Sequence, residues 1–309
     1  MKNTIITIIV LVLVALGVYV AFKQLASPSE TSTPTDTGIA TSTTTSATTT
    51  PSGTATSTPH VVKLQEVIGQ SAGGRDITAH YYGTGTTKLL FVGGIHGGYE
   101  WNTTLVAYKL MDYLTAHPEE IPTNEQITVI PVANPDGLEK TVGTTDRFTV
   151  ADVPTPESAT ISGRFNDNNV DINRNFDCDW SATGTWQNTP VSGGTAAFSE
   201  PEARAIRDYV NAHTPSAVVV WYSAAGGVYS SSCHNGISEE TSAITNLYAQ
   251  ASQYPAYEDF DYYKITGDMV NWLAKENIPA ISVLLTNHTD TEWSKNLAGI
   301  KALLTHYAQ

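Results

Sequence analysis

Four uninterrupted apolar runs predict buried β-strands, at residues 89–92, 127–132, 217–221 and 280–285. A strand with one face in water alternates apolar and polar residues, so continuous runs indicate strands that are covered on both faces. Elsewhere, apolar residues recur every three or four positions. This spacing predicts helices over residues 102–116, 200–212, 242–252, 267–276 and 293–307. We therefore expect an α/β domain in which helices cover both faces of a mixed sheet.

A further apolar run lies near the N-terminus, over residues 4–22, between Lys2 and Lys23. At about 19 residues it is long enough to span a bilayer as a helix. We interpret it as an uncleaved transmembrane signal anchor, which follows a short cytoplasmic stretch (1–3) and exports the rest of the chain. A cleaved signal peptide is the alternative, but Lys23 stands where small residues should mark a cleavage site.

Residues 23–59 consist largely of Ser, Thr, Pro, Gly and Ala. Such a segment lacks the apolar surface that offsets the entropy of ordering, so we expect a disordered linker. Residues 60–309 suit one large α/β domain with a full core. The expected order is thus a membrane anchor, a linker and one extracytoplasmic domain.

The charge balance argues against a nucleic-acid partner. The chain carries 30 acidic residues against 16 Lys and Arg, a net charge of −14, and phosphate binding depends on clustered cations. The only cysteines are Cys178 and Cys233, which do not form a CxxC motif. In an exported domain an isolated pair is typical of a disulfide, and this one would join two loops beside the candidate site.

The first candidate site is the turn that follows the strand at residues 89–92. Here His96 and Glu100 come directly before a predicted helix, and an imidazole and a carboxylate are both zinc ligands. An ordinary strand-to-helix turn without metal is the alternative. Further along, Ser199 and Glu202 have the S-x-x-E spacing of a capping box, which predicts a helix start rather than a catalytic element.

Three further motifs, taken with His96 and Glu100, resemble those of a known family. They are NPDG at residues 134–137, RFNDNNVDINRNF at residues 164–176 and FSEPE at residues 198–202. In this ordered set the chain is similar to zinc metallocarboxypeptidases of the carboxypeptidase A type, from about Val61 to the C-terminus. The resemblance implies a mostly parallel central sheet, a bound zinc ion and hydrolysis of the C-terminal residue of a peptide.

The resemblance also implies individual roles. His96 and Glu100 match two zinc ligands, although three residues separate them here instead of the family's two, and the intervening glycines could absorb the extra residue. Asn173 and Arg174 match the pair that binds the substrate's terminal carboxylate. Arg164 matches the arginine that polarises the scissile carbonyl and stabilises the oxyanion.

Two matches concern the terminal residue of the substrate. Tyr263 matches the mobile tyrosine that covers the bound C-terminus, and the nearby Gly267 and Trp272 strengthen this match. Val270 stands where the family reads the terminal side chain, which indicates an uncharged pocket.

Two departures from the family pattern fall on the chemistry itself. Tyr222 occupies the position of the third zinc ligand, a histidine in the family, and a phenol with an ordinary pKa of about 10 is a poor replacement. Leu284 occupies the position of the catalytic glutamate, and shifting the match by one residue offers only Leu285. A leucine supplies no acid or base.

Other polar residues near the two lost positions are candidate replacements: His234, His288, Asp290 and Glu292. Glu292 is the strongest of them, and its structural alternative is a carboxylate stabilised at the start of a helix.

Two functional interpretations therefore remain open. As an enzyme, the domain would remove C-terminal residues from peptides, cell-wall peptides among them, with a rearranged zinc site. As a binding module, it would hold peptide C-terminal carboxylates through Arg174 without cutting them, and would bind zinc weakly or not at all. A surface scaffold that uses only the fold is a third interpretation.

Overall fold

The computed structural model describes residues 64–309. The segments interpreted as a cytoplasmic stretch (1–3), a transmembrane anchor (4–22) and a linker (23–59) lie outside these residues, as does the start of the predicted domain (60–63). Within the described part of the chain, no helix has both the length and the apolar character needed to cross a membrane.

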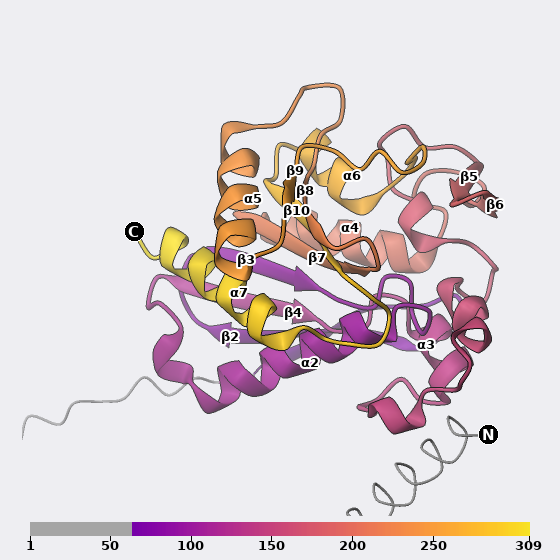
Figure 1. The fold of residues 1–309 in the computed structure, drawn as a ribbon, viewed down its shortest axis with the longest axis horizontal. Helices are drawn as coiled ribbons and strands as arrows, with labels where there is room; N and C mark the ends of the chain where they lie inside the picture. The colour runs from indigo at the N-terminus through magenta and orange to yellow at the C-terminus, as the bar shows by residue number, and fades with distance from the viewer. Residues whose placement is uncertain (1–63) are drawn as a thin grey trace, which may run out of the picture. The chain divides into compact units, whose positions relative to one another are not determined.

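An eight-stranded mixed sheet forms the centre of the domain, with the order β1-β2-β4-β3-β7-β10-β8-β9 (Figure 1). The four predicted strands are its middle ones, and they run parallel to one another. Three of the pairings outside them are antiparallel, β1 with β2, β2 with β4 and β8 with β10. The strands are β1 (Leu64–Gln70), β2 (Asp76–Gly83), β3 (Thr87–Val92), β4 (Glu125–Ile130), β7 (Ala217–Ser223), β8 (Gly227–Ser230), β9 (Ala256–Tyr257) and β10 (Ala280–Leu285).

All five predicted helices are present: α2 (Trp101–Ala116), α4 (Pro201–His213), α5 (Glu239–Ser252), α6 (Met269–Lys275) and α7 (Trp293–Tyr307). A short helix α3 (Pro135–Val142) begins in the NPDG motif. The remaining elements are a small hairpin of β5 (Thr183–Trp186) and β6 (Thr189–Ser192), and the 3-10 turns η1 (Pro118–Glu120), η2 (Val150–Asp152), η3 (Glu157–Arg164) and η4 (Ile172–Arg174).

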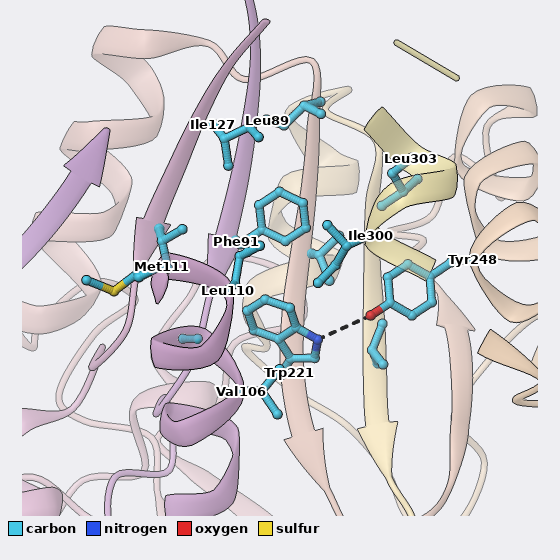
Figure 2. Close-up of a cluster of buried hydrophobic side chains, with 14 of the residues drawn as sticks. Leu89, Phe91, Val106, Leu110, Met111, Ile127, Trp221, Tyr248, Ile300 and Leu303 are labelled. Carbon is cyan, nitrogen blue, oxygen red and sulfur yellow. Dashed lines mark hydrogen bonds between the residues drawn. The ribbon is translucent and has the colours of Figure 1, made fainter. Parts of the chain in front are cut away.

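Two hydrophobic layers, one on each face of the sheet, explain the continuous apolar strands. On one face, α2, α5 and α7 pack over Phe91 and Trp221, whose rings stack 5.6 Å apart (Figure 2). The indole nitrogen of Trp221 donates a hydrogen bond of 3.4 Å to the hydroxyl of Tyr248 on α5. On the other face, α4 and α6 cover alternate residues of the same strands, including Tyr222 and Leu284. Both faces of the sheet are covered by hydrophobic side chains and helices, as the continuous apolar runs predicted.

The predicted capping box does not form. Helix α4 begins at Pro201, so Glu200 rather than Ser199 is the cap residue. The hydroxyl of Ser199 donates to Glu200, and Glu202 turns inward, where it accepts hydrogen bonds from the backbone of Ala72 and the amide of Asn166. The helix start was predicted correctly, but tertiary partners take the two side chains away from the local motif.

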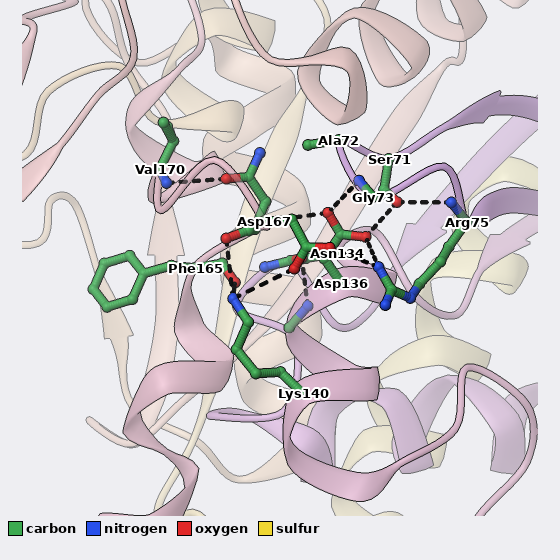
Figure 3. Close-up of polar contacts among 12 residues, drawn as sticks. Ser71, Ala72, Gly73, Arg75, Asn134, Asp136, Lys140, Phe165, Asp167 and Val170 are labelled. Carbon is green, nitrogen blue, oxygen red and sulfur yellow. Dashed lines mark hydrogen bonds and ion pairs between the residues drawn. The ribbon is translucent and has the colours of Figure 1, made fainter.

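The NPDG motif joins two loops that precede the candidate site (Figure 3). Buried Asp136 accepts hydrogen bonds from Ser71, from the backbone of Gly73 and, at 2.8 Å, from Arg75, all in the turn between β1 and β2. The side chain of Asn134 donates to the backbone oxygen of Arg164 at 3.2 Å. This motif therefore fixes the backbone from which Arg164 enters the site.

The predicted disulfide between Cys178 and Cys233 is present, with Cα atoms 6.1 Å apart. It connects the loop after η4 to the loop after β8. The backbone oxygen of Cys178 also accepts a hydrogen bond of 2.7 Å from Gly267, which brings the segment before α6 to the same place. Three loops are thus held together at one edge of the site.

Candidate functional site

The predicted site residues meet in a cleft at the carboxyl ends of β3, β7 and β10. Chain order changes direction between β3 and β7, and such a point in a parallel sheet is where ligands bind. The cleft has a volume of about 590 Å³. The predicted residues that line it are His96, Glu100, Arg164, Asn173, Arg174, Tyr222, Tyr263, Val270 and Leu284.

His96 and Glu100 lie side by side despite the extra residue between them. The Nδ1 atom of His96 is 2.9 Å from a carboxylate oxygen of Glu100. Gly97 allows this turn because its φ is +46° and because a side chain there would collide with the backbone of Gly137 and Gly163. Within residues 64–309, neither ring nitrogen of His96 forms a hydrogen bond of good geometry, although Nδ1 lies near Glu100 and Nε2 near Asp171. One carboxylate oxygen of Glu100 lies near His96 and Arg164, and the other has no hydrogen-bond partner there.

Asp171, a residue without a predicted role, is the anion at the centre of the site. It is fully buried and lies 3.4 Å from Nε2 of His96, while Arg164 contacts it at 2.8 Å and 2.9 Å. Burial opposes its ionisation, but the charges of Arg164, His96 and Arg174 outweigh this cost and hold the pKa of Asp171 below its usual range. Asp171 therefore orients both His96 and Arg164.

Arg164 is packed between aromatic rings as well as paired with Asp171. Its guanidinium carbon lies 4.7 Å from the ring centroid of Trp186 and 5.8 Å from that of Tyr99. A third charged contact, to Glu100, is longer at 3.9 Å. The aromatic faces and Asp171 hold the guanidinium in a fixed plane at the cleft wall.

Arg174 is almost completely buried, yet part of its guanidinium remains unpaired. Two of its nitrogens donate to the backbone oxygens of Asn173 and Thr185, at 2.7 Å and 3.1 Å, while Nε has no hydrogen-bond partner in the described part of the chain. The ring of Tyr263 lies 5.9 Å from its guanidinium carbon. A buried cation with an unmet N–H group in a cleft is suited to bind a carboxylate.

Tyr222 points into the cleft, but its hydroxyl is committed elsewhere. It donates a 3.3 Å hydrogen bond to the side-chain oxygen of Asn173, which also accepts from the backbone of Met269. Burial raises the pKa of Tyr222 well above its ordinary value of 10, with the charges of Asp268 and Glu100 acting in the same direction. The phenol therefore stays protonated at neutral pH.

The residues present do not fit the three-ligand zinc site that the family implies. His96 and Glu100 provide two ligand side chains, and their buried atoms without good hydrogen bonds suit that role. The position predicted for the third ligand holds the protonated phenol of Tyr222, and the side chain of the neighbouring Leu284 offers no oxygen. Among the described residues, the only group of three side chains whose ligand atoms approach one another closely is the exposed His117, Glu119 and Glu120, outside the cleft.

Of the four candidate replacement residues, one lines the cleft and three do not. Glu292 does not line the cleft: it precedes α7 and accepts hydrogen bonds from Thr286 and Tyr254, which matches the structural alternative of a carboxylate at a helix start. His234 is exposed and pairs with Asp179, and Asp290 accepts from the backbone of Glu292. Only His288 reaches the cleft, where Ser223 contacts its Nδ1 atom at 3.0 Å.

The uncharged side-chain pocket around Val270 stays a prediction. Val270 does line the cleft, but so does the carboxylate residue Asp268, together with Asn271 and Ser282. The prediction considered one position, whereas the pocket wall is assembled from the start of α6, from β10 and from the loop after β8. Two sequence signals could have pointed to the acids of the cleft. Asp268 directly precedes a helix, and Asp171 is flanked by apolar residues in Val170-Asp171-Ile172.

Comparison with known proteins gives the class that this fold and cleft define. The chain belongs to the zinc carboxypeptidase family, whose model matches residues 51–292. It is 36% identical over 136 residues to carboxypeptidase B of Helicoverpa zea, a match that covers 40% of this chain and 29% of that protein. It is 30% identical over 160 residues to a zinc carboxypeptidase of Simulium vittatum, covering 49% of this chain and 50% of that protein.

Solved structures share the fold. Bovine thrombin-activatable fibrinolysis inhibitor, in complex with a tick carboxypeptidase inhibitor, superposes with a TM-score of 0.62 at 16% identity, over 80% of this chain and 90% of that one. The carboxypeptidase A of Helicoverpa armigera gives the same TM-score at 19% identity, over 80% and 67%. The sequence matches, by contrast, span half or less of the length of the relatives.

Proposed function

We propose that this domain binds the C-terminal carboxylate of peptides without hydrolysing them. The observation that carries the proposal is the composition of the cleft. Asn173 and Arg174, which we predict to bind the terminal carboxylate, line it together with Arg164, while Tyr222 and Leu284 line it at the positions predicted for a zinc ligand and for the catalytic base.

The electrostatics of the cleft support carboxylate binding. Asp171 neutralises Arg164 through contacts at 2.8 Å and 2.9 Å, whereas no ion pair within residues 64–309 includes Arg174. A ligand carboxylate would supply the missing negative charge, and a charge-assisted hydrogen bond in a buried site is stronger than one between neutral groups. Tyr263, whose ring lies beside Arg174, would cover the bound terminus.

The composition of the reaction centre argues against hydrolysis. Family members use a zinc ion to activate water and a carboxylate to move its proton, and general acid–base catalysis alone contributes roughly 10²- to 10⁴-fold. Here Leu284 replaces the base. Tyr222 keeps its proton and directs it to Asn173, so it contributes neither a metal bond nor a proton acceptor.

Hydrolysis with a rearranged zinc site is the second candidate function. Family membership favours it, and so does the adjacent pair of His96 and Glu100, whose atoms could still coordinate zinc. His288, which also lines the cleft, would then be a candidate for a further imidazole ligand.

One set of measurements separates the two functions. Full-length protein is incubated with an N-acetylated tripeptide and with its C-terminal amide, with and without added zinc, and both binding and cleavage are followed. We expect the free acid to bind and the amide to bind at least about tenfold more weakly. No cleavage product should appear, and the purified protein should contain less than one zinc ion per chain. Replacing Arg174 by Gln should abolish the preference for the free acid, while Arg147→Gln, at an exposed ion pair with Asp112, should not. Release of the terminal residue would establish the enzyme instead.

We also propose an extracytoplasmic location, with residues 4–22 as a membrane anchor and peptide termini, including those of cell-wall peptides, as ligands. The disulfide between Cys178 and Cys233 supports this location, because such bonds persist in oxidising compartments. Labelling of an introduced cysteine in the domain by a membrane-impermeant reagent, on intact cells, tests the orientation. A domain that is labelled only after lysis would contradict it.

A further inference from the structure

A second cavity lies outside the cleft and has no part in the proposed function. Its volume is about 370 Å³, which is within the usual range for small-molecule sites. One side is formed by residues between Asp179 and Thr185, from the loop after η4 and from β5. The other side is formed by Lys264 and Thr266, which precede α6. Among the described residues, none lines both this cavity and the cleft.

Two segments of the chain separate the cavity from the cleft. In β5, Thr185 lines the cavity and the next residue, Trp186, lines the cleft. In the segment before α6, Lys264 lines the cavity and the preceding Tyr263 lines the cleft. The backbone oxygen of Thr185 also accepts the 3.1 Å hydrogen bond from Arg174. The cavity is thus a separate site that shares its supporting backbone with the cleft.

The hydroxyl of Thr266 is buried without a partner. Thr266 lines the cavity and is 7% exposed, and its hydroxyl has no hydrogen-bond partner within residues 64–309. The neighbouring Gly267 donates a 2.7 Å hydrogen bond to the backbone oxygen of Cys178, which fixes the chain at this point. An unpaired buried hydroxyl costs free energy and is uncommon in folded proteins. A ligand that donates or accepts a hydrogen bond would supply the missing partner.

The rest of the lining favours a ligand that is rich in hydroxyl groups. Ser181, Thr183 and Thr185 add three more hydroxyls to the cavity, and each can both donate and accept a hydrogen bond. Within residues 64–309, Trp180 is the only large apolar side chain of the lining. The cavity is therefore unsuited to an aliphatic ligand.

The charged residues of the lining do not indicate an ionic ligand. Lys264 and Asp179 carry opposite charges, and both are exposed. Asp179 already contacts a ring nitrogen of His234 at 2.9 Å. Exposed charges stay hydrated and gain little from pairing with an ion. The group that gains most from a ligand is the neutral, buried hydroxyl of Thr266.

Trp180 adds a flat apolar surface to this polar cavity. Its ring nitrogen donates a 2.9 Å hydrogen bond to the backbone oxygen of Gly193, so the polar edge of the indole is satisfied within the protein. The side chain nevertheless remains partly exposed. A pyranose sugar has C–H groups on the faces of its ring and hydroxyls around its rim, which matches an aromatic surface beside hydroxyl groups.

We propose that this cavity binds a neutral pyranose sugar, with Trp180 against one face of the sugar ring and Thr266 hydrogen-bonded to a sugar hydroxyl. The proposal goes beyond the proposed function and does not depend on it, because the residues concerned line the cavity and not the cleft.

The test measures binding of the methyl glycosides of glucose, galactose, mannose and N-acetylglucosamine to the full-length protein by ligand-observed NMR. We expect at least one of them to bind saturably, with a Kd on the order of 1 mM, as befits a small polar ligand. Thr266→Val keeps the shape of the side chain and removes its hydroxyl. It should weaken binding of that glycoside about fivefold, because one buried hydrogen bond to the ligand is lost. Urea unfolding should find the variant at least as stable as the parent, since the hydroxyl has no partner in the free protein.

Thr104→Val is the matched control. Thr104 lies on α2 and is also buried, and its hydroxyl has no partner in the described part of the chain, but it lines neither the cavity nor the cleft. This variant should bind the glycoside as the parent does.

Three results would overturn the sugar site: no binding of any of the glycosides, equal affinity of the parent and Thr266→Val, or a marked loss of stability in Thr266→Val, which would mean that its hydroxyl has a structural partner. Stronger binding of glycine, a zwitterion without hydroxyl groups, would also overturn it and make Asp179 and Lys264 the ligand-binding groups. None of these results alters the expected preference of the cleft for a free carboxylate, so the two proposals fail independently.

Discussion

Tyr222 and Leu284 lie directly opposite each other in the parallel pairing of β7 with β10. Both side chains belong to the hydrophobic layer under α4 and α6, and both also line the cleft. The two positions at which we predict departures from the family pattern are therefore neighbours in space, although 62 positions separate them along the chain. A carboxylate at position 284 would lie beside a phenol without a metal ion, where it would be buried and unpaired. Leucine at position 284 is therefore compatible with a protonated tyrosine at position 222.

This relationship predicts that activity returns only when both positions change. Tyr222→His with Leu284→Glu should supply a third zinc ligand and a proton acceptor on adjacent strands, beside an intact Arg164 and Arg174. We expect zinc-dependent release of the terminal residue from blocked dipeptides ending in lysine or norleucine, measured by chromatography of the freed amino acid. Each single variant should stay inactive, because one lacks the base and the other lacks the metal.

The parent protein and Tyr222→Phe are the controls for this experiment, and neither should cleave. Cleavage by the parent would show that Tyr222 and Leu284 do not prevent hydrolysis. An inactive double variant that folds and binds one zinc per chain would instead mean that further positions have changed.

Asp171→Asn should be strongly destabilising. It leaves the buried guanidinium of Arg164 without its counterion, and breaking a buried ion pair costs about 3–5 kcal/mol. Urea unfolding, followed by tryptophan fluorescence, measures the loss. Asp208→Asn breaks an exposed pair with Arg207 and should change the free energy of unfolding by less than about 1 kcal/mol. Equal effects of the two changes would contradict a central role for Asp171.

How far the sequence predicts this molecule depends on how local the determining interactions are. Strands 217–221 and 280–285 were predictable because each is apolar along its whole length. Two outer strands were not: the edge strand β9 has two residues, and β2, between β1 and β4, has no continuous apolar run because buried and partly buried positions alternate along most of it. Strand β4 ends at Ile130 rather than Val132, since Pro131 has no N–H group to continue the pairing.

The site shows the same limit. Motif spacing was enough to bring together His96, Glu100, Arg164 and Arg174, because each role belongs to one residue in one motif. The role of Asp171 depends on contacts with His96 and Arg164, which the fold provides from different segments. Sequence proximity could not reveal that network.

The disulfide should contribute to stability because it closes a long loop. Cys178 and Cys233 are 55 residues apart, and closing a loop of this size removes enough entropy from the unfolded chain to stabilise the fold by roughly 2–4 kcal/mol. Replacing both cysteines by serine should lower the free energy of unfolding by this amount. A reducing agent should lower the urea midpoint of the parent and leave the double variant unchanged. Non-reducing mass spectrometry of a digest should find the two peptides linked, and two freely alkylated thiols would contradict the bridge.

Glu125 should make the domain less stable as the pH rises. Its side chain is fully buried at the start of β4, and neither carboxylate oxygen has a hydrogen-bond partner among residues 64–309. Burial raises its pKa from 4.5 to about 8. Between these values the folded protein holds a proton that the unfolded chain has released, so stability is full below pH 4.5 and falls as the pH rises to about 8.

Glu125→Gln removes this titration and should flatten the dependence. Near pH 5 we expect the variant and the parent to have similar free energies of unfolding. At pH 8 the variant should be more stable, because each unit by which folding raises the pKa of Glu125 costs the parent about 1.4 kcal/mol once the pH has passed through that unit. Urea unfolding at half-unit steps of pH measures both slopes. Glu202 and Asp268, whose pKa values burial raises to about 7 and about 6, should keep a smaller slope of the same sign in the variant. Glu276→Gln, at an exposed position after α6, is the matched control and should follow the parent. Parallel curves for the parent and Glu125→Gln would mean that Glu125 is not the group that titrates.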